Sequence, residues 1–252
     1  MINWREHNIH NHNDGHDSGS DSDGQKEFLF NLFEEETDKA LTHDFKSKSG
    51  AVDITITLVG REECNTSTGL AVWGGAETLC DYFMEEIDSG RSENLFQKGQ
   101  SRVLELGAGL GLCGLFVAQA FEPSKVILTD GDVDVLERLE KNIEQNPTSH
   151  EIQVSCAQLV WGQNLDVFAD EHGKFDVIIA SECMYMSPSL QTIWDTVKIL
   201  LDKNGVFVYV HQASSQVPNE KVLEMATNCG FEWSTSSTFS LVHLFRRKTG
   251  YA

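Results

Sequence analysis

Short hydrophobic stretches recur along the chain, and most are separated by segments whose apolar residues have helical spacing. Residues 52–58 alternate strictly between apolar and polar side chains, which is typical of a strand with one buried face. The pattern predicts further strands at 103–106, 126–129, 152–156, 175–180, 205–210 and 239–245. It predicts helices at 112–121, 132–145, 187–201 and 218–229, and a turn followed by a helix within 68–88.

Strands that alternate with helices of this length favour an α/β fold, in which a mostly parallel sheet is covered by helices on both faces. The last strands return like a hairpin, so we expect an antiparallel strand at one edge of the sheet. Ligands of such folds bind beyond the carboxyl ends of the strands. The loops after Leu106, Thr129, Cys156 and Ala180 are therefore where we expect a functional site.

The predicted domain begins only after a long polar segment. Residues 1–24 are rich in His, Asn, Asp, Ser and Gly and have too little apolar surface to order themselves, which predicts a disordered tail. Metal binding is one interpretation of the histidines of this tail, but a solvated low-complexity tail is the better one, and we assign no metal site. Residues 25–50 are predicted to be a linker with a short helix at Phe28–Phe33, and residues 51–252 a single domain.

Charge and composition exclude several classes of function. The 252 residues include 19 Lys and Arg against 39 Asp and Glu, a formal net charge of -20. Such a chain repels a phosphate backbone, and its one basic cluster is Arg246-Arg247-Lys248, so we expect no nucleic-acid substrate. No apolar run is long enough to cross a bilayer and no secretory signal is present, so no membrane association is expected. The six Cys form no CxxC pair, which favours reduced thiols in a cytoplasmic or nuclear protein.

A glycine-rich loop follows the predicted strand at 103–106 and leads into a helix. Glycines at Gly107, Gly109 and Gly111 would let the backbone approach a ligand closely. Asp130 ends the next strand, where its carboxylate can accept hydrogen bonds from ribose hydroxyls. The sequence therefore predicts a nucleoside-containing ligand at this loop.

Three interpretations of the loop compete. Gly109-x-Gly111-x-x-Gly114 formally matches the dinucleotide fingerprint and would predict a nicotinamide-dependent oxidoreductase. Glu105, two residues before the loop, fits S-adenosylmethionine better, because this ligand carries a cationic sulfonium and amino group rather than a pyrophosphate. A loop whose glycines serve packing alone is the third possibility.

The order and spacing of several motifs resemble the seven-strand class I methyltransferases. Within that class the chain is similar to the protein-lysine methyltransferases of methyltransferase family 16, over about residues 67–231. The motifs that carry the resemblance are ELGAGLGLCG, LTDGD, QLVWG, FDVIIASECMY and the earlier VWGGAETL. The resemblance implies a Rossmann-like, mostly parallel seven-stranded sheet and S-adenosyl-L-methionine as the cofactor.

The resemblance also implies roles for individual residues. Trp73 would line the methionine end of the cofactor, and the Gly107-Ala108-Gly109 backbone would hold its amino acid part. Glu105 would lie beside this loop, Asp130 would bind ribose, Trp161 would stack near adenine, and Ser181 would sit at the edge of the cofactor. The family signature Asp-x-x-Tyr corresponds here to Glu182-Cys183-Met184-Tyr185, with the acid one methylene longer. Glu182 and Tyr185 would orient the incoming lysine.

We therefore expect a monomeric, cytoplasmic or also nuclear S-adenosylmethionine-dependent N-methyltransferase that modifies a lysine of an unidentified protein. The longer acid at Glu182 keeps two alternatives open: a methyltransferase for a small molecule or another residue, and a module that binds cofactor without turnover. Cys183 has no neighbouring His in sequence, so we interpret it as a buried thiol rather than a nucleophile. His211 ends an apolar strand and is interpreted as structural, although contact with substrate is possible.

Overall fold

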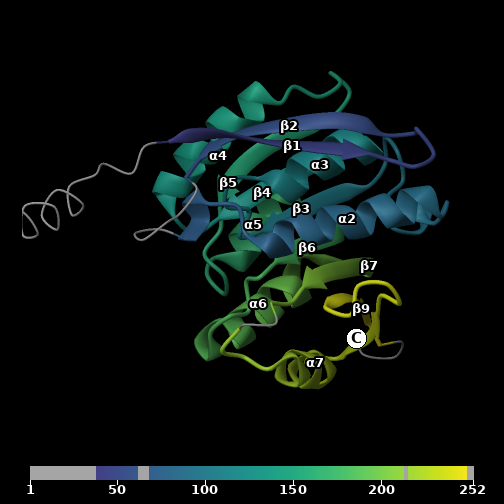
Figure 1. Ribbon diagram of the computed structural model, residues 1–252. Coiled ribbons are helices and arrows are strands. Elements are labelled where there is room, and N and C mark those ends of the chain that lie inside the picture. Colours follow the sequence, from purple (N-terminus) through teal and green to yellow (C-terminus); the bar gives the residue numbers. More distant parts are fainter. Residues whose placement is uncertain (1–37, 62–67, 213–214, 249–252) are drawn as a thin grey trace, which may run out of the picture. The chain divides into compact units, whose positions relative to one another are not determined.

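The computed structural model describes residues 38–61, 68–212 and 215–248 (Figure 1). The chain divides into two compact units, Met1–Glu36 and Thr37–Ala252. The predicted tail 1–24 and the short helix Phe28–Phe33 lie outside the described residues, and everything below concerns the second unit. No helix in the described part of the chain is long and apolar enough to cross a membrane.

A seven-stranded sheet forms the centre of the second unit, in the order β5-β4-β3-β6-β7-β9-β8. β3, β4, β5, β6 and β7 run parallel, whereas β9 is antiparallel to both of its neighbours. The predicted antiparallel strand is therefore present, but it lies one position inside the edge, which β8 forms. The strands are β3 (Arg102–Leu106), β4 (Lys125–Asp130), β5 (Gln153–Gln158), β6 (Phe175–Ser181), β7 (Leu201–Val210), β8 (Phe231–Thr235) and β9 (Val242–Arg247).

Helices cover both faces of the sheet, as predicted. The central strands alternate their side chains between two core clusters: Val103 and Val177 belong to one, Leu104 and Ile178 to the other. Continuous apolar strands are required for this arrangement, because both faces are buried. The first cluster includes side chains from α2 (Gly74–Asp88), α3 (Leu112–Phe121) and α4 (Val133–Gln145); the second includes those from α5 (Leu165–His172), α6 (Ser187–Leu200) and α7 (Asn219–Asn228).

Part of the predicted linker 25–50 is a strand. β1 (Lys39–Lys46) pairs antiparallel with β2 (Asp53–Gly60), and this hairpin packs over α4 and α3 (Figure 1). Leu41 and Phe45 face inward while their neighbours are exposed. Two inward apolar side chains among charged and polar residues gave too weak an alternation to predict β1 from sequence.

Two further elements were missed. α5 lies within the stretch 161–173, which carried no predicted helix, and β8 precedes the predicted last strand as a separate strand. α5 has only eight residues and buries only Leu165 and Phe168, so its pattern of apolar residues is too short to predict a helix. β8 buries only Phe231, as its exposed position at the sheet edge allows.

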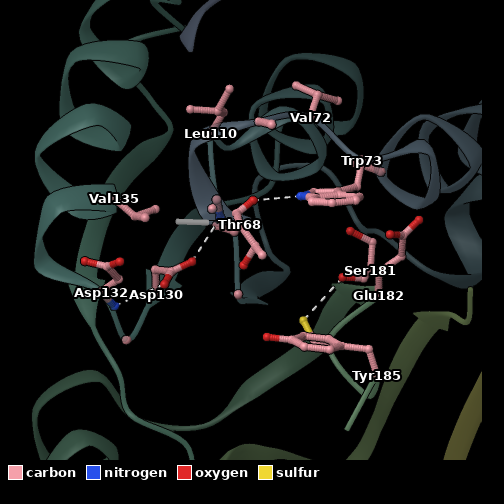
Figure 2. Close-up of a pocket in the computed structure, with 18 of the residues that line it drawn as sticks. Thr68, Val72, Trp73, Leu110, Asp130, Asp132, Val135, Ser181, Glu182 and Tyr185 are labelled. Atoms are coloured by element: carbon pink, nitrogen blue, oxygen red, sulfur yellow. Dashed lines mark hydrogen bonds between the residues drawn. The ribbon is translucent and has the colours of Figure 1, made fainter. Parts of the chain in front are cut away.

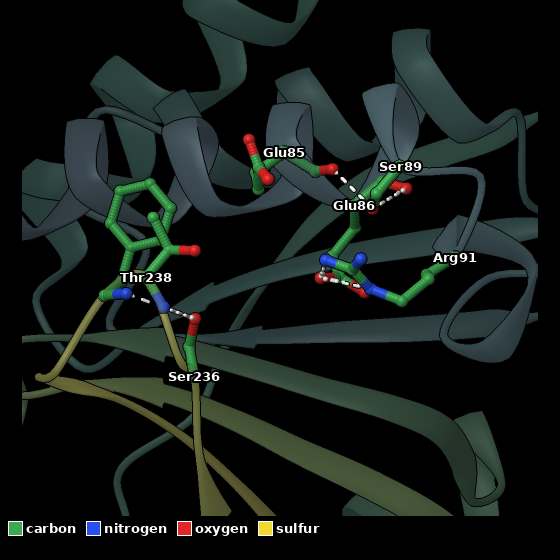
Figure 3. A network of polar contacts seen from close by, with 7 residues as sticks. Glu85, Glu86, Ser89, Arg91, Ser236 and Thr238 are labelled. Carbon is green, nitrogen blue, oxygen red and sulfur yellow. Dashed lines mark hydrogen bonds and ion pairs between the residues drawn. The ribbon is translucent and has the colours of Figure 1, made fainter.

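The C-terminal end of α2 is held by local polar contacts (Figure 3). The Ser89 hydroxyl donates to the carbonyl oxygen of Glu85 at 2.7 Å, and the Arg91 guanidinium binds the Glu86 carboxylate at 2.8 Å. In the turn between β8 and β9, the Ser236 hydroxyl accepts hydrogen bonds from the amides of Thr238 and Phe239. The Ser89 and Arg91 contacts fix the far end of the helix whose beginning borders the cavity described next.

Candidate active site

A cavity of about 510 Å³ lies at the carboxyl ends of the central strands (Figure 2). This volume lies within the range of about 300–1,000 Å³ that small-molecule sites occupy. Residues from the loops after β3, β4, β5 and β6 line it, the same loops at which the strand pattern predicts a functional site. Residues from 68–73 and Ala76 at the start of α2 also line it, as do Gln212, Ser215 and Gln216 after β7.

The glycine loop is held in a backbone conformation that other residues rarely adopt. Gly107, Gly109 and Gly111 have φ values of 62°, 54° and 91°. A Cβ atom on Gly107 would lie 2.7 Å from the Cys183 sulfur, and one on Gly109 would lie 3.1 Å from the carbonyl oxygen of Gly69. These two glycines therefore allow the loop to pack directly against neighbouring segments and present its backbone to the cavity.

Asp130, at the end of β4, ties this loop to the next one. One carboxylate oxygen accepts a hydrogen bond from the Gly109 amide at 3.1 Å, and the other accepts one from the Asp132 amide at 3.1 Å (Figure 2). Burial raises the pKa of Asp130, and the backbone donors partly oppose that rise. Its carboxylate lines the cavity, as predicted, and has lone pairs left for a ligand.

Glu105 does not line the cavity. It is only 3% exposed, and its carboxylate accepts a hydrogen bond from the Gly114 amide at 2.9 Å behind the loop. Burial raises its pKa to about 8. Glu105, predicted beside the loop as a cofactor-binding residue, lies outside the cavity lining and supports the first turn of α3.

Two tryptophans stand at the cavity. The indole N–H of Trp73 donates to the carbonyl oxygen of Thr68 at 2.7 Å, and the ring remains 46% exposed. Trp161 lies against Gly107, so that a Cβ atom there would be 3.1 Å from its ring. Its indole N–H is buried and has no hydrogen-bond partner among the described residues. Both rings line the cavity, in agreement with the prediction.

Ser181, Glu182 and Tyr185 follow β6 on the opposite side of the cavity (Figure 2). Glu182 has a φ of 55°, which is uncommon for a residue other than glycine, and its carboxylate accepts a hydrogen bond from the Gly75 amide. Burial raises the pKa of Glu182, and the Gly75 amide opposes the rise. Tyr185 is 41% exposed. The carboxylate of Glu182 and the ring of Tyr185 therefore both line this side of the cavity.

Cys183 and His211, which we interpret as structural from the sequence, are both buried and hydrogen-bonded. The Cys183 thiol is buried and donates to the carbonyl oxygen of Leu106 at 3.2 Å, and burial raises its pKa. His211 is 3% exposed and lies 2.9 Å from the carbonyl oxygen of Val217 and 3.2 Å from the Tyr209 hydroxyl. Cys183 lies at the cavity wall, but its thiol is engaged with the Leu106 carbonyl and its raised pKa disfavours the thiolate.

Sequence reasoning missed part of the lining. Asp132 and Val135, at the start of α4, face the cavity, and Asp132 stands within the LTDGD motif, where a second acid could have been noticed. Gln212, Ser215 and Gln216 follow β7 and belong to no recognisable motif. Their position became evident only once the end of β7 lay beside the end of β6.

The charge of the cavity selects among ligands. Asp130, Asp132 and Glu182 line it, and no Lys, Arg or His is present among the lining residues that the structure describes. Three carboxylates without a cation disfavour a pyrophosphate and favour a ligand with positive charge. This argues against the dinucleotide interpretation of the glycine loop.

Comparison with known proteins shows which family the chain is similar to. The sequence model of a family described as lysine methyltransferase matches residues 53–228. Calmodulin-lysine N-methyltransferase of Arabidopsis thaliana is 32% identical over 54% of this chain and 42% of its own length. EEF1A lysine methyltransferase 3 of Mus musculus is 33% identical over 53% of this chain and 51% of its own.

A longer match is to the protein-lysine N-methyltransferase EEF2KMT of Mus musculus, 30% identical over 66% of this chain and 51% of its own length. The chain thus spans about half the length of the curated relatives it matches. The matched regions include the segments that build the cavity.

Proposed function

The chain belongs to the lysine methyltransferase family, and from this membership we propose that it transfers a methyl group from S-adenosylmethionine to a lysine side chain of a protein. The observation that carries the proposal is the cavity itself. A glycine loop, three carboxylates and three aromatic rings line it, and no cationic side chain does so among the described residues.

The residues present fit S-adenosylmethionine. Backbone groups at Gly107, Ala108 and Gly109 would hold its amino acid part, and Asp130 would bind its ribose hydroxyls. Trp161, whose indole N–H has no partner in the part of the chain that the structure describes, would pack against the adenine. Trp73 would face the sulfonium, which an aromatic ring attracts, and Ser181 would lie at the edge of the ligand. When bound, this cofactor supplies an already activated methyl group.

On the acceptor side, Glu182 and Tyr185 orient the lysine. Methyl transfer is an in-line displacement, so positioning the amine contributes most of the acceleration. The amine must be neutral, whereas the pKa of a free lysine is about 10.4. A nearby carboxylate raises that pKa, so Glu182 binds and orients the ammonium, and its proton leaves to water before attack. Tyr185, partly exposed at the mouth, positions the side chain through its ring or hydroxyl.

Isothermal titration tests the cofactor site. We expect wild-type protein to bind S-adenosylhomocysteine, and Asp130→Ala to weaken the dissociation constant at least about tenfold, because a ribose contact and a loop contact are both lost. Asp134→Ala is the matched control, since Asp134 lies close by on α4 but outside the cavity. Absence of binding to the wild-type protein would refute the cofactor assignment.

A radiolabelled methyl donor tests the acceptor. Cell lysate treated with the enzyme should incorporate label into its protein fraction, and acid hydrolysis should release methylated lysine. Purified calmodulin and EEF1A are reasonable first single substrates, because two relatives carry these names. Glu182→Gln, which keeps an acceptor for the Gly75 amide but removes the charge, should lower kcat/KM by about ten- to a hundredfold. Label found only in small molecules would refute the protein substrate.

A further inference from the structure

Asn142 lies on the inner side of α4 at a junction between two distant segments. It is fully buried. Its side-chain oxygen accepts a hydrogen bond from the Val59 amide of β2 at 2.8 Å. Its side-chain nitrogen donates to the carbonyl oxygen of Leu110 in the glycine loop at 3.0 Å, and to that of Val59 at 3.4 Å. A single amide thus joins the hairpin to the loop that lines the cavity.

One helical turn further on, Asn146 binds the hairpin in the same way but does not contact the loop. Its oxygen accepts from the Thr57 amide at 3.0 Å, and its nitrogen donates to the carbonyl oxygens of Thr57 at 2.8 Å and Asn142 at 2.7 Å. Each asparagine satisfies both backbone groups of one β2 residue, as a neighbouring strand would. The two residues therefore differ in one respect that matters here, the bond to Leu110.

The loop that Asn142 contacts is the glycine loop, whose glycines have positive φ angles. Leu110 stands between Gly109 and Gly111, both with positive φ, and the Gly111 amide donates to the carbonyl oxygen of Ala108 at 2.8 Å. Asp130 holds the loop from one side through the Gly109 amide, and Asn142 holds it from the other through Leu110. Together with the Ala108 amide, which donates to the carbonyl oxygen of Thr129 at 2.8 Å, these contacts orient the peptide groups of the loop.

The hairpin approaches the same loop directly. A Cβ atom on Gly60, the last residue of β2, would lie 2.1 Å from a methyl carbon of Leu110, so the missing side chain makes room for the loop. The next residue, Arg61, donates its backbone amide to the carbonyl oxygen of Leu70, in the segment that leads to Trp73. The hairpin is thus connected to two walls of the cavity.

We propose that Asn142 is a positioning residue of the cofactor site, which sets the glycine loop for S-adenosylmethionine and couples cofactor binding to the attachment of the β1–β2 hairpin. The inference rests on the proposed function. It assigns a role in ligand binding to a residue outside the cavity and to a hairpin whose first strand the sequence did not reveal. Since coupling between two equilibria is reciprocal, the ligand must also stabilise the attached hairpin.

Paired substitutions separate positioning from stability. Asn142→Ala and Asn146→Ala each remove one buried amide from the same helix face and loosen the hairpin, but only the first frees the loop. Titration of the folded proteins with S-adenosylhomocysteine should give a dissociation constant about tenfold weaker for Asn142→Ala and within about twofold of wild type for Asn146→Ala. Equal affinity of the two variants would overturn the proposal.

Hydrogen exchange of the wild-type protein gives a second test that needs no substitution. Added S-adenosylhomocysteine should slow exchange at the Thr57 and Val59 amides of β2, which the asparagines bind outside the cavity. If the ligand binds and slows exchange in the glycine loop but leaves β2 unchanged, the coupling does not exist. If the wild-type protein binds no ligand at all, the proposed function itself fails, which is a different result from the other two.

Discussion

At the scale of single residues, Glu105 and Asp130 show how the fold places two nearby carboxyl groups in different surroundings. They end neighbouring strands, yet Asp130 lines the cavity, while Glu105 lies behind the glycine loop. Asp130 receives two backbone hydrogen bonds, whereas Glu105 receives one, from Gly114. A buried carboxyl group with few donors favours its neutral form, and this has a measurable effect on stability.

Glu105 should make the protein less stable as the pH rises. Its ordinary pKa of 4.5 is raised to about 8 by burial, so the folded state binds more protons than the unfolded state between these values. The free energy of unfolding therefore falls from about pH 4.5 to about pH 8 and then levels off. Glu105→Gln stays neutral and lacks this fall, so it should gain on the order of 5 kcal/mol relative to wild type across the window.

Urea unfolding at several pH values checks this expectation. The informative quantity is the difference between Glu105→Gln and wild type, because other titrating groups cancel in it. Glu137→Gln, an exposed substitution on α4, serves as the control and should show a constant difference. A constant difference for Glu105→Gln as well would mean that its carboxyl is ionised in the folded protein over the whole range.

Most of the cavity's residues could be predicted from sequence, because they follow strand ends or stand in motifs. Trp73, Asp130, Trp161 and Tyr185 were found in this way and do line the cavity. Glu105 was placed at the ligand because sequence gives proximity along the chain but not the direction of a side chain. In a buried strand, alternate side chains point to opposite faces, and the side of the loop that Glu105 reaches depends on the packing of α3.

At the scale of elements, the beginning of α2 is built around a side chain from another segment. The N-cap residue, Trp73, provides no side-chain cap, and the Glu182 carboxylate accepts the bond from the Gly75 amide instead. A Cβ atom on Gly75 would lie 2.5 Å from the Glu182 carboxylate. The second glycine of the Trp-Gly-Gly sequence, Gly75, therefore leaves the space that the Glu182 carboxylate occupies.

Gly75→Ala should displace Glu182 without changing any titratable group. Alanine suits a helix, and Gly75 is not among the residues with positive φ, so the steric contact with Glu182 is the main effect. We expect kcat/KM for the protein acceptor to fall about tenfold or more, with the affinity for S-adenosylhomocysteine nearly unchanged. Steady-state kinetics and titration measure the two quantities.

Gly74→Ala is the matched control for this experiment, since a Cβ atom on Gly74 meets nothing within 4 Å. It should leave kcat/KM close to the wild-type value. Equal losses for the two variants would show that the start of α2 tolerates no side chain in general, and that the Glu182 contact is not the cause.

The sequence predicted long, strongly periodic elements well and short ones poorly. α3 and the parallel strands of the sheet were found because buried elements carry apolar residues over their whole length. β1, α5 and β8 each bury few side chains, so their patterns are brief. β1 also depends on partners far along the chain, because β2 and the α4 asparagines hold the hairpin in place.

At the scale of the whole molecule, net charge is the property that bears most on encounter with a protein substrate. The formal net charge is -20, and the cavity is lined by carboxylates among the described residues. A field of this sign attracts a basic protein surface and accelerates encounter with it. Because exposed charges are screened by salt, this contribution to the rate depends on ionic strength.

Raising sodium chloride from about 0.05 M to about 0.5 M should therefore lower kcat/KM for a basic protein substrate several-fold, because the Debye length falls below the distances over which the proteins attract each other. The value of kcat at saturating substrate should change little, since it reports the bound complex. Initial rates at varied substrate and salt separate the two. A kcat/KM that is independent of salt would mean that the molecule's charge does not guide its substrate.

The position of β9 between β7 and β8 also determines the order in which the sheet can be completed during synthesis on a ribosome. β8 is made before β9, yet its sheet partner is β9. Until residues 242–247 have left the exit tunnel, β7 exposes an unpaired edge and β8 has no place in the sheet. Unpaired edges recruit other chains. The interval before β9 emerges is therefore the time when the edge of β7 in a nascent chain is open to pairing with another chain.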